Sequence, residues 1–186
     1  MTGDAAFTAK DGAVERVVQG LDASEASFAE FYDTHRDEVV RALTFTVGSL
    51  SLAEEAADEA MARAYQKWSE VSGYANPSGW VYRVGLNWAR SWKRSAALRK
   101  RREEKVAHSE LRTNSTTDAP QPESQVLIDA LSQLSIEQRA VVVLRHDCDW
   151  SVAEVAAALN ISEGTVKSRS NRGLEKLRAI LAEEVT

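Results

Sequence analysis

Cations near the C-terminus are the residues of this chain best suited to chemistry. Between Glu163 and Arg178, five basic side chains stand against two acidic ones, a net charge of +3. The basic residues are Lys167, Arg169, Arg172, Lys176 and Arg178. An arginine can donate two hydrogen bonds to O6 and N7 of guanine, and a good pair of this kind contributes about 1–3 kcal/mol of base discrimination. The segment therefore suits the reading of duplex DNA; the alternative is a solvated, charged helix face.

The residues around this segment predict two helices joined by a tight turn. Ser151 and Glu154 form an S-x-x-E capping box, so a helix should begin directly after the serine. Asn160 tolerates the left-handed backbone that a sharp turn needs, and Ser162 can cap a second helix that runs to about Leu181. The apolar residues expected to face inward are Val155, Ala156 and Leu159 on the first helix and Val166, Leu174, Leu177 and Leu181 on the second. This pattern is typical of a DNA-binding helix-turn-helix, whose second helix lies in the major groove.

A second group of cations is interleaved with tryptophans. Between Gly79 and Lys105, nine basic residues stand against two acidic ones, a net charge of +7. Trp80, Trp88 and Trp92 recur at helical spacing; the first two are most simply core residues. Trp92 has cations on both sides and is less easily buried, and an exposed aromatic beside cations can stack nucleic-acid bases for about 1–3 kcal/mol each.

The stretch from Ser51 to Glu70 carries the opposite charge, −3. A second S-x-x-E box, Ser51 with Glu54, predicts a helix from there to about Val71. Its alanines imply close packing against neighbouring helices, and its acidic face suggests a protein partner. The alternative is a solvated face with pairs four residues apart, such as Glu59 with Arg63.

Composition agrees with a globular helical protein. The 186 residues are 44% hydrophobic and 27% charged, with nine glycines, three prolines and one cysteine, Cys148. No apolar run is long enough to span a membrane, the N-terminus lacks a signal-peptide core, and a single cysteine excludes an internal disulfide. We therefore expect a cytoplasmic protein that does not use a membrane. The net charge of −5 does not exclude nucleic acid, because the distribution of charge matters more than its sum.

The search for catalytic chemistry gives nothing. The sequence contains no H-E-x-x-H, C-x-x-C, P-loop or G-x-S-x-G motif, and its three histidines are far apart. We expect no enzyme activity, no metal site and no cofactor.

The remaining signals predict an all-α chain of two small helical domains joined by a flexible linker. Further helices are expected from about Ser27 to Val47, ended by Gly48, and from Ser78 to about Arg102, capped by Asn76. Polar residues with almost no apolar side chain follow. Beyond them come a short amphipathic helix from Val126 to Leu134 and a helix opened by the Ser135–Gln138 capping box. The expected division is 1–26, an N-terminal extension; 27–105, the first domain; 106–124, the linker; and 125–186, the second domain.

These segments together resemble the extracytoplasmic-function (group IV) sigma factors of bacterial RNA polymerase. AEEAADEAMARAYQKW looks like the core-binding helix of sigma region 2, and NPSGWVYRVGLNWARSWKR looks like its promoter-reading helix. LSIEQRAVVVLRHDCDWSVAEVAAALNISEGTVKSRSNRGLEKLR looks like region 4. The order of these motifs, with a polar linker between them, is more specific than any one of them.

The resemblance implies a transcription initiation factor that reads two promoter elements while bound to core RNA polymerase. The residues implied for the duplex minus-thirty-five element are Thr165, Lys167, Ser168, Arg169 and Arg172. Those implied for the melted minus-ten strand, with one base flipped into a loop pocket, are Tyr74, Asn76, Asn87, Arg90, Trp92, Lys93 and Arg94. Those implied for docking on the clamp helices of the largest polymerase subunit are Glu55, Asp58, Glu59 and Arg63. The resemblance also implies a contact with the flap of the second-largest subunit and an anti-sigma factor as a partner. It implies that the free protein is a monomer.

Four positions depart from the family pattern. Ser170 stands where leucine is usual, Gly173 where alanine is usual, Ser91 where aspartate is common, and Ser135 where proline is common. Glycine within a helix costs about 0.5–1 kcal/mol relative to alanine, so the second helix of the motif should be weaker or bend at Gly173.

Two other functions stay open from the residues alone. One is a free-standing helix-turn-helix regulator that binds duplex DNA without polymerase. The other is a sigma-like interaction protein that has lost its DNA function.

Overall fold

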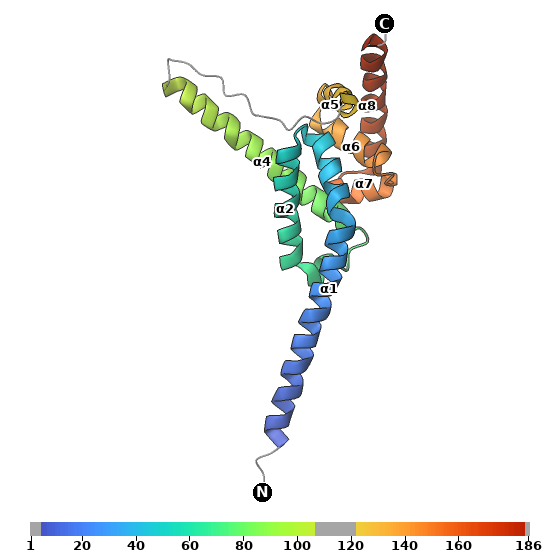
Figure 1. The fold of residues 1–186 in the computed structure, drawn as a ribbon. Coiled ribbons are helices and arrows are strands. Elements are labelled where there is room, and N and C mark those ends of the chain that lie inside the picture. The colour runs from blue at the N-terminus through green and yellow to red at the C-terminus, as the bar shows by residue number, and fades with distance from the viewer. Residues whose placement is uncertain (1–4, 107–121, 185–186) are drawn as a thin grey trace.

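The computed structural model describes residues 5–106 and 122–184, and within these ranges all the regular secondary structure is α-helical. The helices are α1 (Ala5–Val47), α2 (Leu50–Gln66), α3 (Trp68–Val71), α4 (Pro77–Val106), α5 (Pro122–Ser132), α6 (Ile136–His146), α7 (Val152–Leu159) and α8 (Glu163–Glu184). Figure 1 shows α1 and α4 as long helices that project from the centre in different directions, with α5 to α8 grouped at the side away from the free end of α4.

The first domain is built from α1 to α4, and small residues let its helices approach closely. Five alanines of α2 are completely buried: Ala53, Ala56, Ala57, Ala60 and Ala64. A Cβ atom on Gly85 of α4 would lie 3.0 Å from the Ala56 carbonyl oxygen, so no larger side chain fits where α4 crosses α2. The expected close packing of the alanine face is confirmed.

Local capping explains most helix ends of this domain, with one correction. Gly48, at φ +75°, ends α1, and the Asn76 side chain accepts a hydrogen bond of 2.7 Å from the Gly79 amide at the start of α4. The capping box expected at Ser51 is wrong: α2 begins at Leu50, two residues before the expected start at Leu52, and Ser49 is its N-cap, accepting from the Leu52 amide. A single continuous helix to Val71 is also wrong, because the backbone leaves the helical region at Lys67 (φ −118°, ψ 21°) before α3 begins.

The second domain, α5 to α8, follows its sequence signals closely. Both capping boxes are present, Ser135 with Gln138 on α6 and Ser151 with Glu154 on α7. Hydrogen bonds from Ser151 lower the pKa of Glu154, so the α7 box persists with an ionised carboxylate at neutral pH. Asn160 ends α7 in the left-handed region (φ 54°, ψ 53°), as predicted.

Two segments differ from the sequence expectation in extent. α1 begins at Ala5 rather than near Ser27, so the described part of the N-terminal stretch continues the helix. Of the expected linker, 106–124, the first residue ends α4 and residues 122–124 form the first turn of α5, while 107–121 lie outside the described residues.

The unusual residues of α8 have a packing reason. A Cβ on Gly173 would lie 2.6 Å from Cγ2 of Val142, so glycine allows α8 to cross α6 at close range. Ser170 is buried, and its hydroxyl lies 3.2 Å from Nε2 of His146 on α6. The helix continues without interruption through both positions to Glu184.

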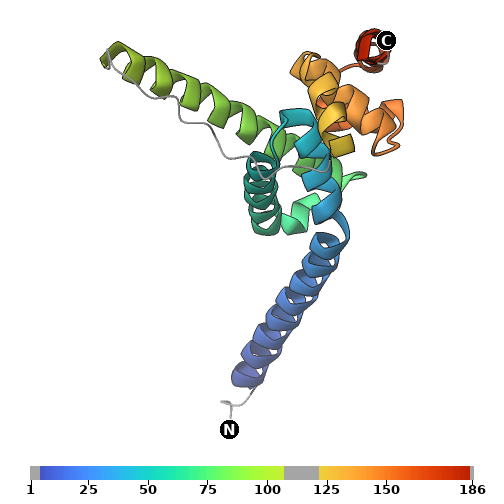
Figure 2. The same cartoon turned by 45° about the horizontal axis from the view of Figure 1, so that its top comes forward.

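The two domains pack against each other, and their buried apolar residues form one connected cluster. Arg139 of α6 donates a hydrogen bond of 2.9 Å to the Thr46 carbonyl of α1, and Nε of Arg41 lies 3.2 Å from an Asp147 carboxylate oxygen. Tyr82 of α4 meets Trp150 edge to face, with ring centroids 6.4 Å apart. Figure 2 shows α6 and α7 beside the upper part of α1 and the start of α4. Among the helices described, none is both long and apolar enough to cross a bilayer.

Candidate nucleic-acid interface

The second helix of the helix-turn-helix, α8, has one face buried against the rest of its domain and the opposite face exposed. Val166 is fully buried and Leu177 nearly so, which anchors the inward face. The Ser162 hydroxyl accepts from the Thr165 amide at 3.2 Å and caps the first turn, as predicted. Arg172 is exposed, so its guanidinium is accessible to a ligand. This is the arrangement that a helix needs to insert its outer face into a major groove.

The other residues expected on this face lie around the first two turns of α8. Lys167 and Ser168 are exposed, whereas Thr165 and Arg169 are half-buried. Lys167 lies 3.8 Å from Glu163, an exposed pair four residues apart that a phosphate could replace at little cost. The Ser168 hydroxyl donates to the Thr165 carbonyl at 3.1 Å. The structure therefore brings all five residues of the expected duplex-reading set to one end of one helix.

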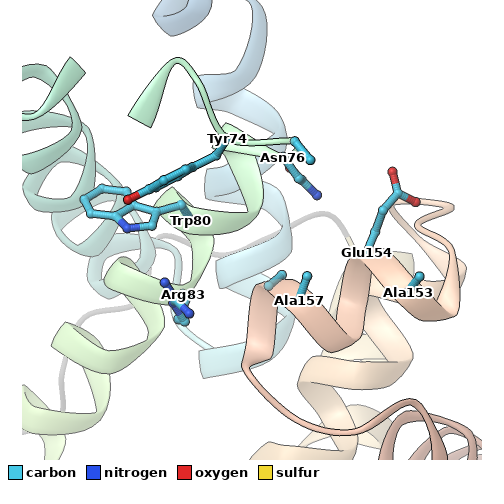
Figure 3. Close-up of a pocket in the computed structure, with 9 residues that line it drawn as sticks. Tyr74, Asn76, Trp80, Arg83, Ala153, Glu154 and Ala157 are labelled. Atoms are coloured by element: carbon cyan, nitrogen blue, oxygen red, sulfur yellow. The ribbon is translucent and has the colours of Figure 1, made fainter. Parts of the chain in front are cut away.

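A pocket of about 450 Å³ lies beside the loop that precedes α4. Its first wall is made by that loop and the start of α4, through Tyr74, Ala75, Asn76, Trp80 and Arg83. Its second wall comes from α7, through Ala153, Glu154, Ala157 and Ala158. Figure 3 shows Tyr74 and Trp80 on one side and the α7 residues on the other, with Arg83 between them. Its aromatic and cationic first wall suits a nucleobase and its phosphate.

The sequence predicted Tyr74 and Asn76 for the melted minus-ten strand but did not single out Trp80 or Arg83, which line the same wall of the pocket. Trp80 was expected in the core, yet it is half-buried and lines the pocket. Arg83 entered the sequence analysis only as part of the basic charge. Residues 80 and 83 lie on one face of α4, directly after the loop residue 76, and this spacing was the available signal.

The remaining residues of the expected strand-binding set divide into exposed and engaged side chains. Asn87, Trp92 and Arg94 are exposed, Trp92 by 42%, which confirms that this tryptophan is not a core residue. Lys93 donates a hydrogen bond of 2.5 Å to the Val47 carbonyl at the end of α1, and its partial burial there lowers the pKa of the ammonium group. Arg90 reaches the Glu137 carboxylate of α6 at 3.2 Å. Neither contact could be predicted from the sequence, because both partners are more than 40 residues away.

The acidic face of α2 is exposed and carries its own ion pairs. Glu59 and Arg63 pair at 2.7 Å, as predicted. Asp58 accepts two hydrogen bonds from Arg36 of α1, at 2.8 and 3.1 Å. The bond to the Asp58 carboxylate raises the pKa of the Arg36 guanidinium. Glu55 is exposed on the same helix. The face is thus an ordered, charged surface available to a protein partner.

Comparison with known proteins identifies the family of the chain. Residues 31–105 match sigma-70 region 2, and residues 124–177 match sigma-70 region 4. The chain belongs to the sigma-70 family of RNA polymerase sigma factors. It is a sigma factor of the extracytoplasmic-function group, and such proteins are non-enzymatic subunits that direct RNA polymerase in transcription initiation.

Several relatives match this sigma factor along most of its length. It is 33% identical to an RNA polymerase sigma-E factor of Streptomyces coelicolor over 153 residues, which cover 81% of this chain and 84% of the relative. It is 32% identical to the ECF RNA polymerase sigma factor SigL of Mycobacterium tuberculosis over 174 residues, 89% of this chain and 96% of the relative.

A solved structure supports the fold. The sigma factor RpoE of Bartonella quintana, solved in complex with the anti-sigma factor NepR, superposes with a TM-score of 0.69 at 20% identity, covering 84% of this chain and 97% of that one. The similarity confirms the all-helical fold, and the family matches place region 2 before region 4.

Proposed function

We propose that this sigma factor reads two promoter elements with two separate surfaces while it is bound to core RNA polymerase. One surface is the outer face of α8, and the other is the loop before α4 with the exposed face of that helix. The observation that carries the proposal is that both surfaces occur on one chain, each with exposed cations on a well-anchored helix. A free-standing helix-turn-helix regulator would need the first surface alone.

The duplex-reading role falls to region 4. We assign the minus-thirty-five element to Thr165, Lys167, Ser168, Arg169 and Arg172, which share one end of α8. Arg172 is the best candidate for a guanine, because an exposed guanidinium can approach the base edge while the buried face of α8 keeps its backbone in place.

The strand-binding role falls to region 2. We assign the melted minus-ten strand to Tyr74, Asn76, Asn87, Arg90, Trp92, Lys93 and Arg94, with Trp80 and Arg83 added from the pocket lining. Flipping a base out of a duplex costs a few kcal/mol, which stacking on aromatic side chains and contacts in the pocket can return. The exposed indole of Trp92 offers such a stacking surface further along α4.

The contact with polymerase is assigned to α2. Glu55, Asp58, Glu59 and Arg63 would dock on the clamp helices of the largest subunit, and region 4 would contact the flap of the second-largest subunit. The proposed domains are 27–105 for region 2 and 125–186 for region 4, with 1–26 as an extension and 106–124 as the linker.

The cellular setting follows from this role. We propose a cytoplasmic protein that is a monomer when free of polymerase and is held inactive by an anti-sigma factor. Complex formation of the Bartonella quintana RpoE with NepR supports an anti-sigma partner for this chain.

Run-off transcription with purified core polymerase tests the proposal. Templates carrying promoters selected by the reconstituted holoenzyme should give a specific transcript that depends on this protein. Tight duplex binding without any promoter-specific transcript would instead favour the free-standing regulator. Unchanged activity in cells after both Arg90→Ala and Arg172→Ala would favour an interaction protein without DNA function.

The base assignment of Arg172 has its own test. Arg172→Ala should cost about 1–3 kcal/mol of binding at a single promoter position, measured by competition between promoters that differ in one base pair. Arg178→Ala, which removes an exposed cation from the same helix outside the assigned set, is the matched control. A loss that is equal for all sequences would make Arg172 a phosphate contact.

A further inference from the structure

The three acidic residues assigned to the polymerase-docking face of α2 are held in different ways. Glu55 forms no ion pair with any residue in the described part of the chain, whereas Glu59 pairs with Arg63 on its own helix at 2.7 Å. Asp58 is bonded instead by Arg36, a residue of α1 that lies 22 positions earlier. Within the described ranges, its carboxylate is therefore the one of the three whose orientation depends on a second helix.

The two hydrogen bonds from Arg36 to Asp58 end on the same carboxylate oxygen. Nη2 donates to Oδ1 at 2.8 Å, and Nε donates to it at 3.1 Å. Among the residues that the structure describes, none donates to Oδ2, and the side chain of Asp58 is 56% exposed. One oxygen is thus tied to α1, while the other is accessible to a cation of a docked protein.

The guanidinium of Arg36 is itself held on the surface of α1. Its central carbon lies 5.9 Å from the centroid of the Tyr32 ring, one helical turn earlier. Nη1 lies 3.6 Å from a carboxylate oxygen of Asp37. The side chain of Arg36 is 26% exposed, less than half the exposure of Asp58. The contact therefore joins a restrained cation to a more exposed anion.

The backbones that carry this pair are fixed by the core of region 2. Figure 1 shows α1 and α2 side by side. Val39 of α1 and Ala57 and Met61 of α2 are buried, so the helix turns next to Arg36 and Asp58 pack against the rest of the domain. Because neither backbone is free to shift, the bonds from Arg36 set the direction of the Asp58 carboxylate on the face of α2.

We propose that Arg36 is a positioning residue for docking on core RNA polymerase, because it holds the Asp58 carboxylate in the orientation in which its free oxygen meets a cation of the polymerase. The inference rests on the proposed assignment of α2 to this contact. A side chain that is already ordered loses less conformational freedom when a complex forms, so the pair raises affinity without adding a contact of its own. The docking of α2 thus depends on a residue of α1.

The opposite role for Arg36 is competition with polymerase for the Asp58 carboxylate. An exposed ion pair contributes little to stability, so removing Arg36 should leave the fold intact in either case. Affinity for polymerase moves in opposite directions, however. Loss of a positioning residue weakens binding, whereas loss of a competitor strengthens it.

A double-mutant cycle on the full chain separates these roles. Affinity for purified core polymerase is measured by fluorescence titration for wild type, Arg36→Ala, Asp58→Ala and the double variant. Arg36→Ala should weaken binding about three- to tenfold, and Asp58→Ala at least as much. The double variant should bind within about twofold of Asp58→Ala, because Arg36 acts only through that carboxylate. Arg178→Ala, which removes an exposed cation of α8, is the control and should stay within about twofold of wild type.

Two further measurements distinguish positioning from a purely structural role. The melting temperature of Arg36→Ala, followed by circular dichroism, should change by at most about 4 °C. In the nuclear magnetic resonance spectrum of the free wild-type protein, the Nε–H group of Arg36 should be protected from exchange with water, and Asp58→Ala should remove that protection. A larger fall in melting temperature, or an unprotected Nε–H group in wild type, overturns the positioning role.

The outcomes of the cycle separate this inference from the proposed function. Binding by Arg36→Ala that equals or exceeds that of wild type overturns the inference, and so do losses that add in the double variant. Full affinity of Asp58→Ala also overturns it, but leaves α2 to be judged by a charge reversal at Glu59. Run-off transcription tests the sigma role separately, so that role can stand when the positioning fails.

Discussion

At Gly173, two helices meet so closely that the side chain can be no larger than a hydrogen atom. Helix propensity alone favours alanine there by about 0.5–1 kcal/mol. The Cβ of that alanine would lie 2.6 Å from Cγ2 of Val142, a residue that is 5% exposed and has little room to move. Packing therefore outweighs propensity, which explains a glycine in the middle of the DNA-reading helix.

Gly173→Ala should lower the free energy of unfolding by about 1–3 kcal/mol, because overpacking at the α6–α8 crossing forces the helices apart. Urea denaturation followed by circular dichroism measures the change. Gly164→Ala is the matched control on the same helix, since a Cβ there meets no atom closer than 3.9 Å and should stabilise by up to about 1 kcal/mol. Recovery of stability in Gly173→Ala combined with Val142→Ala would identify the clash as the cause, and a stable single variant would contradict it.

Cys148 is a half-buried thiol in the loop between α6 and α7, and burial, reinforced by Asp147 and Glu38, raises its pKa to about 12. The thiolate is the reactive form, so at pH 8 native Cys148 should be alkylated about a thousandfold more slowly than in the unfolded chain. Its alkylation rate should still be rising with pH above 9, where an exposed thiol is already half ionised. Mass spectrometry after timed iodoacetamide treatment measures the alkylation rate at pH 8 and its dependence on pH. Rapid labelling at pH 8 in the folded protein would contradict the buried position.

At the scale of single elements, turns and caps decide where the helices of region 4 begin and end. Asn160 forms the turn between α7 and α8 at φ 54° and ψ 53°. Its backbone N–H donates hydrogen bonds to the Ala156 and Ala157 carbonyls. A residue with a Cβ is strained in this region, and asparagine is the least strained apart from glycine.

Asn160→Ala should therefore lower the free energy of unfolding by about 1–2 kcal/mol. Asn160→Gly should be close to neutral, because glycine adopts the same backbone without strain. Thermal or urea denaturation compares the two variants. Equal losses for alanine and glycine would show that the asparagine side chain, and not its backbone, matters.

Signals within a few residues of each other predicted most of these elements. The boxes at Ser135 and Ser151 and the turn at Asn160 depend on contacts three or four residues away, so the sequence shows them. The start of α2 was misplaced because Ser49 and Ser51 are both acceptable caps, and the choice between them depends on packing. The break at Lys67 has no glycine or proline to mark it.

The candidate site was predictable in its residue types but not in its contacts. Exposed cations and the indole of Trp92 follow from charge and spacing. The pairing of Arg90 with Glu137 and of Lys93 with the Val47 carbonyl joins residues that are 47 and 46 positions apart, and such pairs leave no periodic trace in a sequence. The second wall of the pocket was missed for the same reason, since it belongs to the other domain.

At the scale of the whole molecule, the charged surfaces are segregated. The acidic face of α2 and the basic faces of α4 and α8 lie on different helices, so one chain with a net charge of −5 can present an anionic surface to a protein and cationic surfaces to DNA.

Glu59→Lys should weaken binding to core polymerase about tenfold or more, because it reverses a charge on the proposed docking face. The helical content of the protein should not change, since the lost ion pair with Arg63 contributes only about 0.3–0.5 kcal/mol to stability. Glu30→Lys, an equal charge change on the exposed surface of α1, is the control. Equal affinities of wild type and Glu59→Lys in a fluorescence titration with core polymerase would remove α2 from the interface.

Arg139 links the two domains through hydrogen bonds to backbone carbonyls. Its guanidinium binds the Thr46 carbonyl at the end of α1 and also the Ser132 and Leu134 carbonyls of the turn before α6, so one side chain ties an unpaired helix end of one domain to a loop of the other. None of these three carbonyls belongs to a residue assigned to the promoter. After burial, Arg139 also contributes to the lowered pKa of Lys93, so a change at this one position would act both on the contact between the domains and on a lysine assigned to the minus-ten strand.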